Sequence, residues 1–318
     1  MLIRAAGVFV FGLNGGSGSS EKVIIYSNAD DEAVDAIKGA LDDNGYKGKY
    51  IFQTFGTSEL GGKLLAEGKN VEADLVTMSS FYLDSAQEQN QMFEKLTFEA
   101  QTLSETPDFY RPITSQEGAI IVNTEVMKEE NLPMPKSIRD LADPVYAGQI
   151  SVTDIKSSST AWLLIQALVE EYGEDEAKDI LTDIYKNAGP HIEDSGSGPL
   201  KKVRSGEVAV GFGLRHQVAA DKEDGLPVDY VDPTEGNFSL TESVAVVDKK
   251  EDTNPLAMEM AECIVKNGRE QLQKTYPNAL YVGETTDKSN ESEYPRVFSE
   301  PLTAELLERH QELSESCK

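Results

Sequence analysis

Histidine, cysteine and tryptophan are scarce in this sequence. Its 318 residues contain three histidines, two cysteines and one tryptophan. His191, His216 and His310 stand at no metal-ligand spacing, so the sequence predicts no metal centre and no cofactor. Gly211-Phe212-Gly213 lacks the third glycine of a dinucleotide-binding fingerprint, and no Gly-x-Ser-x-Gly elbow occurs. We therefore expect a protein that binds a ligand and not one that catalyses a reaction.

Basic residues are also few. There are 29 lysines and arginines against 56 aspartates and glutamates, which gives a formal net charge of -27, and no basic run occurs. Surfaces that bind nucleic acid carry clustered positive charge, so we exclude DNA and RNA as partners. A small anion is not excluded, because surface charges more than roughly 8 Å away are screened at physiological salt while helix termini act at contact.

Long hydrophobic runs are missing as well. The apolar residues 5–13 are too few to span a bilayer, which takes about 20 residues, and a Gly/Ser-rich stretch follows at 14–20. We interpret 1–22 as the remnant of an export signal and a linker, which predicts an extracytoplasmic protein in the periplasm or at the cell surface. A lipid tether on the native precursor is left open. Cys263 falls on an apolar helical face and Cys317 in the polar tail, and a disulfide between them is left open too.

Strand and helix patterns alternate along the rest of the chain. We predict strands at 23–26, 50–52, 74–78, 118–123, 149–152, 191–192, 208–212 and 243–247, and helices at 31–44, 59–67, 161–172, 174–187, 255–267 and 271–276. The last two helices are expected to end at Gly268 and Pro277. This alternation predicts an α/β fold with helix-covered, mostly parallel sheets.

The length of the chain and the lack of an internal linker predict two lobes. Single hydrophobic cores stop growing at about this size. We expect 23–117 together with 246–318 to form the first lobe, and 118–245 to form the second. The chain then crosses between the lobes along two strands, which would act as a hinge and let a cleft close.

Three predicted strands are followed by small polar clusters that open helices. The clusters lie at 56–58, 157–160 and 195–198. A helix start offers free backbone N–H groups and a partial positive charge, which hold an anion without a metal. The residues that we expect to hold an oxyanion are Thr57, Ser58, Ser158, Ser159, Thr160 and Ser197.

Four further residues are candidates for the same cleft. Arg215 and His216 follow a predicted strand and would add positive charge. Glu242 lies inside an apolar strand segment, so it needs either an ion-pair partner in the other lobe or a ligand hydroxyl or ammonium. Asn28 follows the first strand. Together with Glu242, it would contact the part of the ligand that lies beyond the oxyanion. The acidic residues at 30–32 favour a helix start, whose dipole they complement, over a metal site.

Taken in order, these segments resemble the type II solute-binding proteins of ABC importers. The resemblance covers about 23–285 and is carried by Val-Ile-Ile-Tyr-Ser-Asn at 23–28, Gly-Thr-Ser-Glu-Leu at 56–60, Ser-Ser-Ser-Thr-Ala at 157–161, Ser-Gly-Ser at 195–197 and Gly-Glu-Val-Ala-Val-Gly at 206–211. Within that family, the resemblance is to the branch that includes ferric-ion, 2-aminoethylphosphonate and sugar-phosphate binders. The resemblance implies a two-lobed, non-enzymatic receptor with a membrane permease as its partner, and we expect a monomer.

Within that branch, the residues favour a phosphate- or phosphonate-bearing solute. Ferric-ion binders usually have a Tyr-Tyr pair after the strand at 208–213, where this sequence has Leu-Arg-His-Gln at 214–217, and Asp30 stands where many of them have histidine. The resemblance therefore implies a small organic anion of the 2-aminoethylphosphonate or sugar-phosphate type. Three alternatives stay open: a ferric-ion or other metal carrier, a polyamine or choline binder, and a phosphate-ester enzyme that uses Asp30 or His216 as acid or base.

Overall fold

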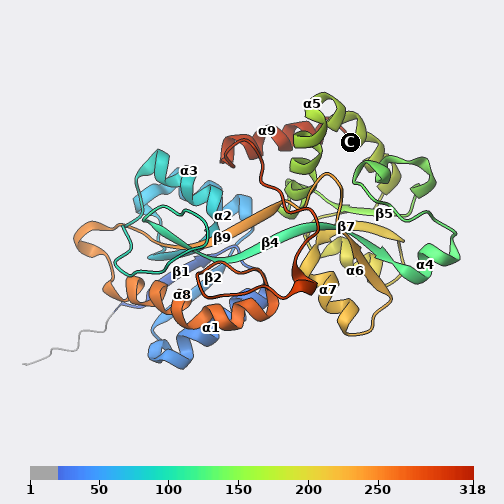
Figure 1. Ribbon diagram of the computed structural model, residues 1–318. Helices are drawn as coiled ribbons and strands as arrows, with labels where there is room; N and C mark the ends of the chain where they lie inside the picture. The colour runs from blue at the N-terminus through green and yellow to red at the C-terminus, as the bar shows by residue number, and fades with distance from the viewer. Residues whose placement is uncertain (1–20) are drawn as a thin grey trace, which may run out of the picture.

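The computed structural model describes residues 21–318, which form an α/β protein with two lobes (Figure 1). The predicted signal remnant and linker lie almost entirely outside these residues. The strands are β1 (Val23–Ser27), β2 (Tyr50–Thr54), β3 (Leu75–Ser79), β4 (Tyr110–Asn123), β5 (Ile150–Thr153), β6 (Ile192–Glu193), β7 (Val210–Leu214), β8 (Val228–Val231) and β9 (Ser239–Val246). They pair in the order β2-β1-β3-β9-β4-β7-β5-β6, with β8 on β4.

The first lobe is a sheet covered on both faces by helices. These helices are α1 (Asp31–Leu41), α2 (Thr57–Glu67), α3 (Ser80–Asn90) and α8 (Pro255–Thr275). Every residue of β3 is buried because successive side chains point to opposite faces: Leu75 packs with α1 and α8, and Val76 with α2 and α3. The strands β1, β2 and β3 pair in parallel, and their carboxyl ends therefore meet at one edge.

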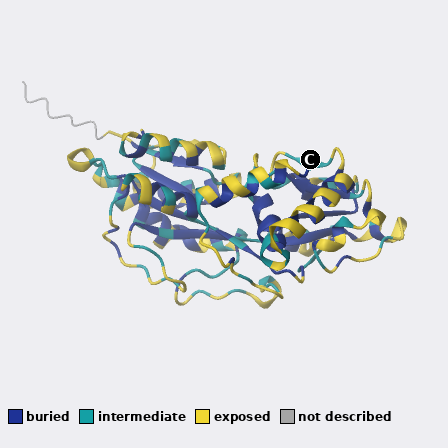
Figure 2. Cartoon of the chain, turned by 90° about the horizontal axis from the view of Figure 1, so that it is seen from above, coloured by how far each residue is buried: buried dark blue, intermediate teal, exposed yellow. Residues whose placement is uncertain are grey.

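The second lobe repeats this arrangement with a different set of helices. They are α4 (Thr124–Glu129), α5 (Thr160–Ala188), α6 (Gly198–Arg204) and α7 (Arg215–Glu223). Ile120 of β4 packs on the side of α5, whereas Ile121 packs with α6 and α7. Figure 2 shows the consequence, since the strands are buried and the outer faces of the helices are exposed. The predicted helix-covered α/β fold is confirmed.

Two long strands connect the lobes. Residues 110–117 of β4 pair with β9, while residues 118–123 pair with β7 and β8. The strand β9 also pairs with β3, so β4 and β9 both pass between the lobes, as Figure 1 shows. This is the arrangement that a two-stranded hinge requires. The exact lobe boundaries stay a proposal.

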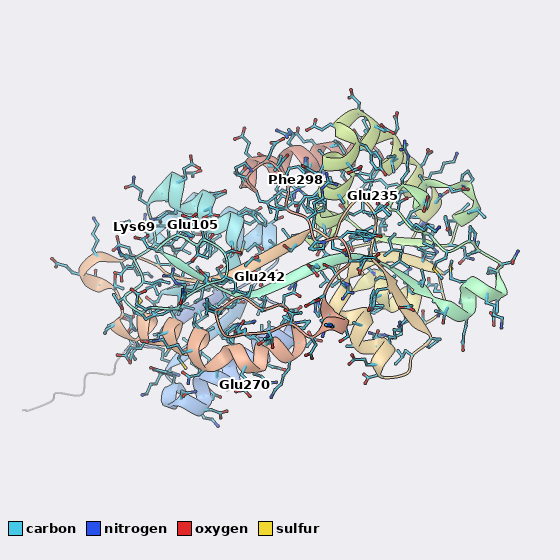
Figure 3. The ribbon with its side chains drawn as sticks, viewed as in Figure 1. Lys69, Glu105, Glu235, Glu242, Glu270 and Phe298 are labelled. Carbon is cyan, nitrogen blue, oxygen red and sulfur yellow. The ribbon has the colours of Figure 1, made fainter. Side chains whose placement is uncertain are left out.

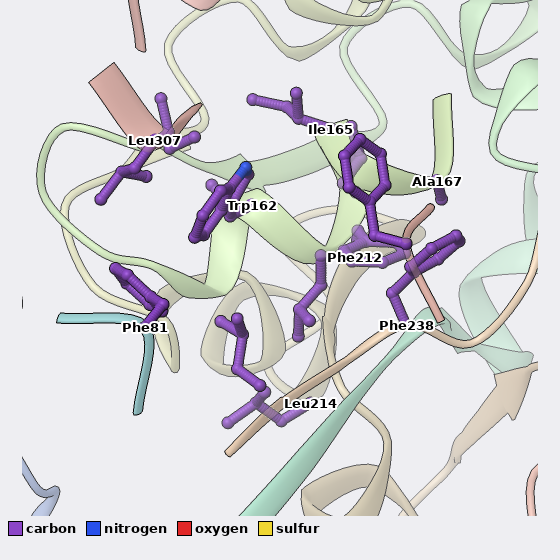
Figure 4. Packing of buried hydrophobic residues seen from close by; sticks show 14 of the residues in the cluster. Phe81, Trp162, Ile165, Ala167, Phe212, Leu214, Phe238 and Leu307 are labelled. Atoms are coloured by element: carbon purple, nitrogen blue, oxygen red, sulfur yellow. The ribbon is translucent and has the colours of Figure 1, made fainter. Parts of the chain in front are cut away.

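The C-terminal segment packs on the second lobe. The helix α9 (Ala304–Glu315) lies against α5, where the Trp162 indole donates to His310 Nδ1 over 2.8 Å. Figure 4 shows Trp162 between Phe81 of α3 and Leu307 of α9. The buried Trp162 thus packs in the core. We propose to assign 288–318 to the second lobe, whereas the sequence pattern placed it with the first.

Several elements differ from the sequence-based expectation. The helix α8 continues through Gly268, because this glycine packs against Ala40 inside a continuous amphipathic helix. The two helices predicted at 161–172 and 174–187 form one element, α5, which bends at Gly173, where φ is 77°. Cys263 and Cys317 are both free and buried. No helix among residues 21–318 has the length and apolarity that crossing a membrane requires.

Candidate functional site

A cavity of about 640 Å³ lies between the two lobes. Its walls come from the ends of β1 and β7, from the middle of β4 and β9, from the first turns of α1, α2, α5, α6 and α7, and from the last turn of α8. Figure 3 labels Glu242 at this central position. The predicted residues that line the cavity are Asn28, Thr57, Ser158, Ser159, Thr160, Ser197, His216 and Glu242. The structure therefore brings together eight residues that are far apart in the sequence.

Four of the five helices that begin at this cavity have no side-chain cap at the residue before the helix, and the fifth, α1, is capped by Asp30, which accepts from the Ala33 N–H. The residues before α2, α5, α6 and α7 are Gly56, Ser159, Ser197 and Leu214, and none of them accepts a hydrogen bond from its own helix. In contrast, α4, α8 and α9 are capped by Asn123, Asn254 and Thr303. A missing cap costs about 1 kcal/mol of helix stability. The first turns of α2 and α7 leave N–H groups as donors for a bound anion. At the start of α5 the Thr160 N–H already donates to Ser158 Oγ, and at the start of α6 the Gly198 N–H donates to the Ser195 carbonyl oxygen, so these two starts contribute mainly hydroxyl groups.

Two serine-rich loops of the second lobe make one continuous wall. A Cβ atom at Gly196 would lie 2.3 Å from Thr160 Oγ1 and 3.2 Å from Ser158 Oγ. Only glycine fits at this position, because the loop before α6 packs directly on the start of α5. Ser159, Ser195 and Ser197 line the same wall. We call the wall formed by 158–160 and 195–197 the hydroxyl wall.

The opposite wall belongs to the first lobe. Asn28 donates through Nδ2 to Thr57 Oγ1 at 3.0 Å and to Ser79 Oγ at 3.2 Å. Its carbonyl oxygen Oδ1 is buried and has no hydrogen-bond partner among the described residues. Glu242 is paired with Ser79 across β3 and β9, so its carboxyl group lies beside Asn28. We call Asn28, Asp30 and Glu242 the acceptor wall.

Burial raises the pKa values of both acids of the acceptor wall. Loss of solvent and the nearby Asp30 raise the pKa of Glu242 to about 7, and the Asn28 amide offsets part of this rise. Burial also raises the pKa of Asp30, although Asp30 accepts hydrogen bonds from Tyr276 Oη and from the Ala33 N–H at the start of α1. The pKa of Tyr276 is raised as well, so its hydroxyl stays a donor.

His216 lines the cavity but does not add the positive charge that the sequence predicted. Burial lowers the pKa of its imidazole to about 4, and the ring packs against Tyr276 with the ring centres 5.0 Å apart. His216 is therefore neutral at pH 7. Its Nε2 atom is buried without a partner among residues 21–318. It can exchange one neutral hydrogen bond with a ligand.

Arg215 and Ser58 lie outside the cavity, which differs from the expectation. Arg215 forms a buried ion pair with Asp232, with Nε–Oδ1 and Nη2–Oδ2 distances of 2.8 and 3.2 Å, and stacks on Tyr230. Ser58 is exposed and lines a separate hollow between α2, α3 and α9, together with Tyr82. Neighbouring residues in a helix point about 100° apart, so only one residue of each pair faces the cavity.

The cavity also contains polar residues that the sequence patterns did not identify. Gln116 and Gln217 line it, and Gln217 Oε1 is buried without a partner among residues 21–318. Three basic residues stand near its rim: Lys201, Lys274 and Arg204, the last paired with Asp221. Lys201 lies one turn after the predicted serine cluster, which is a signal that could have found it. Gln116 lies on the half of β4 that the sequence did not predict, and no sequence pattern pointed to it.

The described residues do not support a metal centre or an aromatic cage. No group of three histidine, cysteine or acidic side chains within 21–318 is placed to hold a metal ion. None of the residues that line the cavity is phenylalanine, tyrosine or tryptophan. Binding in this cavity would therefore depend on hydrogen bonds and charge.

Comparison with known proteins gives a consistent result. The sequence pattern of the family described as bacterial extracellular solute-binding protein matches residues 64–296. An uncharacterized protein of Haemophilus influenzae is 25% identical over 246 residues, which cover 74% of this chain and 69% of that protein.

Solved structures share the fold at low sequence identity. The periplasmic binding protein AfuA from Actinobacillus pleuropneumoniae, solved with fructose-6-phosphate, is 22% identical with a TM-score of 0.74, and the match covers 94% of this chain and 98% of AfuA. Iron-bound HitA from Pseudomonas aeruginosa is 18% identical with a TM-score of 0.76, covering 93% and 99%. Proteins with this fold thus bind chemically different solutes.

Proposed function

Since this chain belongs to the bacterial extracellular solute-binding proteins, the receptors of ABC importers, we propose that it captures a small phosphate- or phosphonate-bearing organic anion and delivers it to a membrane permease. Membership of the family accounts for an extracytoplasmic binding protein with a type II periplasmic fold. The nature of the solute, the monomeric state and the site residues are our proposal.

One observation carries the choice of an anion. Four helices begin at a single cavity without side-chain caps, and serine and threonine hydroxyls surround two of these starts. Such groups place N–H and O–H donors around an oxyanion without adding full positive charge. A phosphate or phosphonate offers three oxygens, enough to use donors from several helix starts at once.

Closure of the lobes would follow from contacts on both walls. Thr57 belongs to the first lobe, and Ser158, Ser159 and Thr160 belong to the second. A ligand shifts the open and closed populations only by its different affinity for the two states. An anion that reaches Thr57 and the hydroxyl wall together binds the closed state better, and β4 and β9 allow the movement.

The alternatives receive less support from the structure. A ferric-ion carrier needs several anionic or aromatic ligands, and the described residues provide no such group. A polyamine or choline binder of the cage type needs aromatic rings, which the cavity lining lacks. A phosphate-ester enzyme would need both an acid and a base that titrate near neutral pH. Glu242, with a pKa of about 7, is one such group, but the pKa of His216, at about 4, is too low for His216 to be the general acid.

The proposal is tested by identifying the solute and weakening its site. Native mass spectrometry of the purified protein should find a phosphate- or phosphonate-bearing molecule. Replacing Ser159 and Thr160 together by alanine should weaken calorimetric binding of that molecule, or of ethylphosphonate, by about 1–3 kcal/mol per lost hydrogen bond. Ser58→Ala is the matched control, because it removes a hydroxyl from a helix start outside the cavity. Unchanged affinity in the double variant contradicts the assignment.

A further inference from the structure

The two walls of the cavity differ in what they offer a ligand. The hydroxyl wall presents the O–H donors of its serine and threonine side chains at the starts of α5 and α6. The acceptor wall presents the carboxyl groups of Glu242 and Asp30 and the carbonyl oxygen of Asn28. A ligand that only carries an oxyanion satisfies the first wall and supplies no positive charge to the second.

The acceptor wall has no cation of its own. Neither Asp30 nor Glu242 forms an ion pair with a lysine, arginine or histidine of residues 21–318. The groups that donate to the two acids are neutral: the Asn28 amide, which also donates to Thr57 and Ser79, lies beside Glu242, and the hydroxyl of Tyr276 donates to Asp30. Buried acids without a cation are costly, so a protein retains them at a cleft where a ligand supplies the cation.

The charged and titratable groups around the acceptor wall do not supply a cation to Asp30 or Glu242. From α1, Asp31 and Glu32 add negative charge next to Asp30. From α7, His216 is neutral, and from α8, Lys274 is exposed and donates to Gln271 at 3.1 Å. The remaining basic residues of the lining, Lys201 and Arg204, stand on α6 of the other lobe.

We propose that the solute is a zwitterion, with an ammonium group held by Glu242, Asp30 and Asn28 and a phosphate or phosphonate group held by the hydroxyl wall. This inference deepens the proposed function and rests on it. An ammonium suits the site because it supplies three N–H donors to three acceptors and a full positive charge to two acids. A metal ion does not suit it, because the described residues offer no third anionic ligand.

The test compares two probes that differ in one group. Binding of 2-aminoethylphosphonate and of ethylphosphonate is measured by calorimetry at pH 7.5. The amine-bearing probe should bind at least about tenfold tighter, since it alone can form charge-assisted hydrogen bonds with the acceptor wall. Titrations in two buffers of different ionisation enthalpy should show that 2-aminoethylphosphonate releases more protons on binding to the wild type than on binding to Glu242→Gln, because an ammonium draws Glu242 into its ionised form.

Two variants test which residue causes the preference for the amine-bearing probe. Glu242→Gln should bind 2-aminoethylphosphonate more weakly than the wild type and reduce its preference over ethylphosphonate, because one of the two acids that face the ammonium is lost. A single cooperative thermal unfolding transition, as in the wild type, shows that the variant is folded. Glu117→Gln, a partly buried acid of β4 outside the cavity, should keep the full preference. Equal binding of the two probes by the wild type, with ethylphosphonate still bound through Ser159 and Thr160, overturns the zwitterion but not the proposed function. Failure of both phosphonates and of inorganic phosphate to bind overturns both.

Discussion

Glu242 shows how one residue can link the ligand to the stability of the protein. Its carboxyl group is held in the cleft at the point where β9 meets β3, with Asn28 as its neutral neighbour. The free protein has to leave it protonated or bear the cost of a buried charge. Ligand binding and pH therefore act on the same proton.

The pH dependence of stability tests this description of Glu242. Its pKa is raised from 4.5 to about 7 in the folded chain, so the folded state binds this proton more tightly than the unfolded state. The contribution of this group to stability is complete below about pH 4.5 and is lost as the pH rises to about 7. In the absence of ligand, Glu242→Gln should be more stable than the wild type at pH 8 by up to roughly 3 kcal/mol, with no difference near pH 4.

Denaturant titrations at pH 4, 6 and 8 measure this difference. Glu305→Gln, at an exposed position on α9, corrects for the loss of one negative charge in an acidic protein. A constant difference between Glu242→Gln and the wild type across the three pH values would show that the buried carboxyl group is not the cause.

At the scale of elements, the sequence predicted what short-range pattern encodes. The strands β1, β3, β5 and β7 and the helices α1 and α2 follow from hydrophobic periodicity, and the polar clusters correctly marked the starts of α2, α5 and α6. The first half of β4 and the helices α3 and α9 were missed. Their burial depends on partners far along the chain, as β4 pairs with β9 and α9 packs on α5.

The residues of the candidate site were likewise predictable only where the sequence signal is local. The loops were predictable because a helix start is a local signal, whereas the direction of a single side chain depends on register. Arg215 and His216 are adjacent, yet one is paired with Asp232 and the other faces the cavity. The acceptor wall was predicted only in part, since Asp30 looked like an ordinary helix cap. The pKa of its carboxyl is raised by burial, which depends on how distant segments pack around it.

Two glycines with opposite roles give a test at the scale of helices. Gly268 lies inside α8, where an added Cβ would contact Ala40 at 3.4 Å, an ordinary packing distance. Gly268→Ala should therefore raise the free energy of unfolding by about 0.5–1 kcal/mol through helix propensity. Gly173 has a positive φ of 77°, so Gly173→Ala should lower it by about 1 kcal/mol. Thermal unfolding of both variants measures the effects, and stabilisation by the second contradicts the bend in α5.

At the scale of the whole molecule, the net charge of -27 opposes the capture of an anion. The donors at the helix starts act only at contact, whereas the acidic surface acts over a Debye length of about 30 Å at 10 mM salt and about 8 Å at physiological salt. Net charge and local site therefore influence different steps of binding. The surface affects the rate of encounter, and the cavity affects the lifetime of the complex.

Salt should accelerate binding of an anion by this protein. Between 10 and 150 mM NaCl, the association rate constant for ethylphosphonate should rise roughly several-fold, because the repulsion by the acidic surface is screened. The dissociation rate constant should change little, since the bound group is enclosed between the lobes. Stopped-flow measurements that follow Trp162 fluorescence report both rates.

With 2-aminoethylphosphonate, which carries less net charge, the acceleration of binding by salt should be smaller. An association rate that falls with salt would mean that positive charge near the cleft, such as Lys201 and Lys274, dominates the approach of the ligand over the surrounding acids.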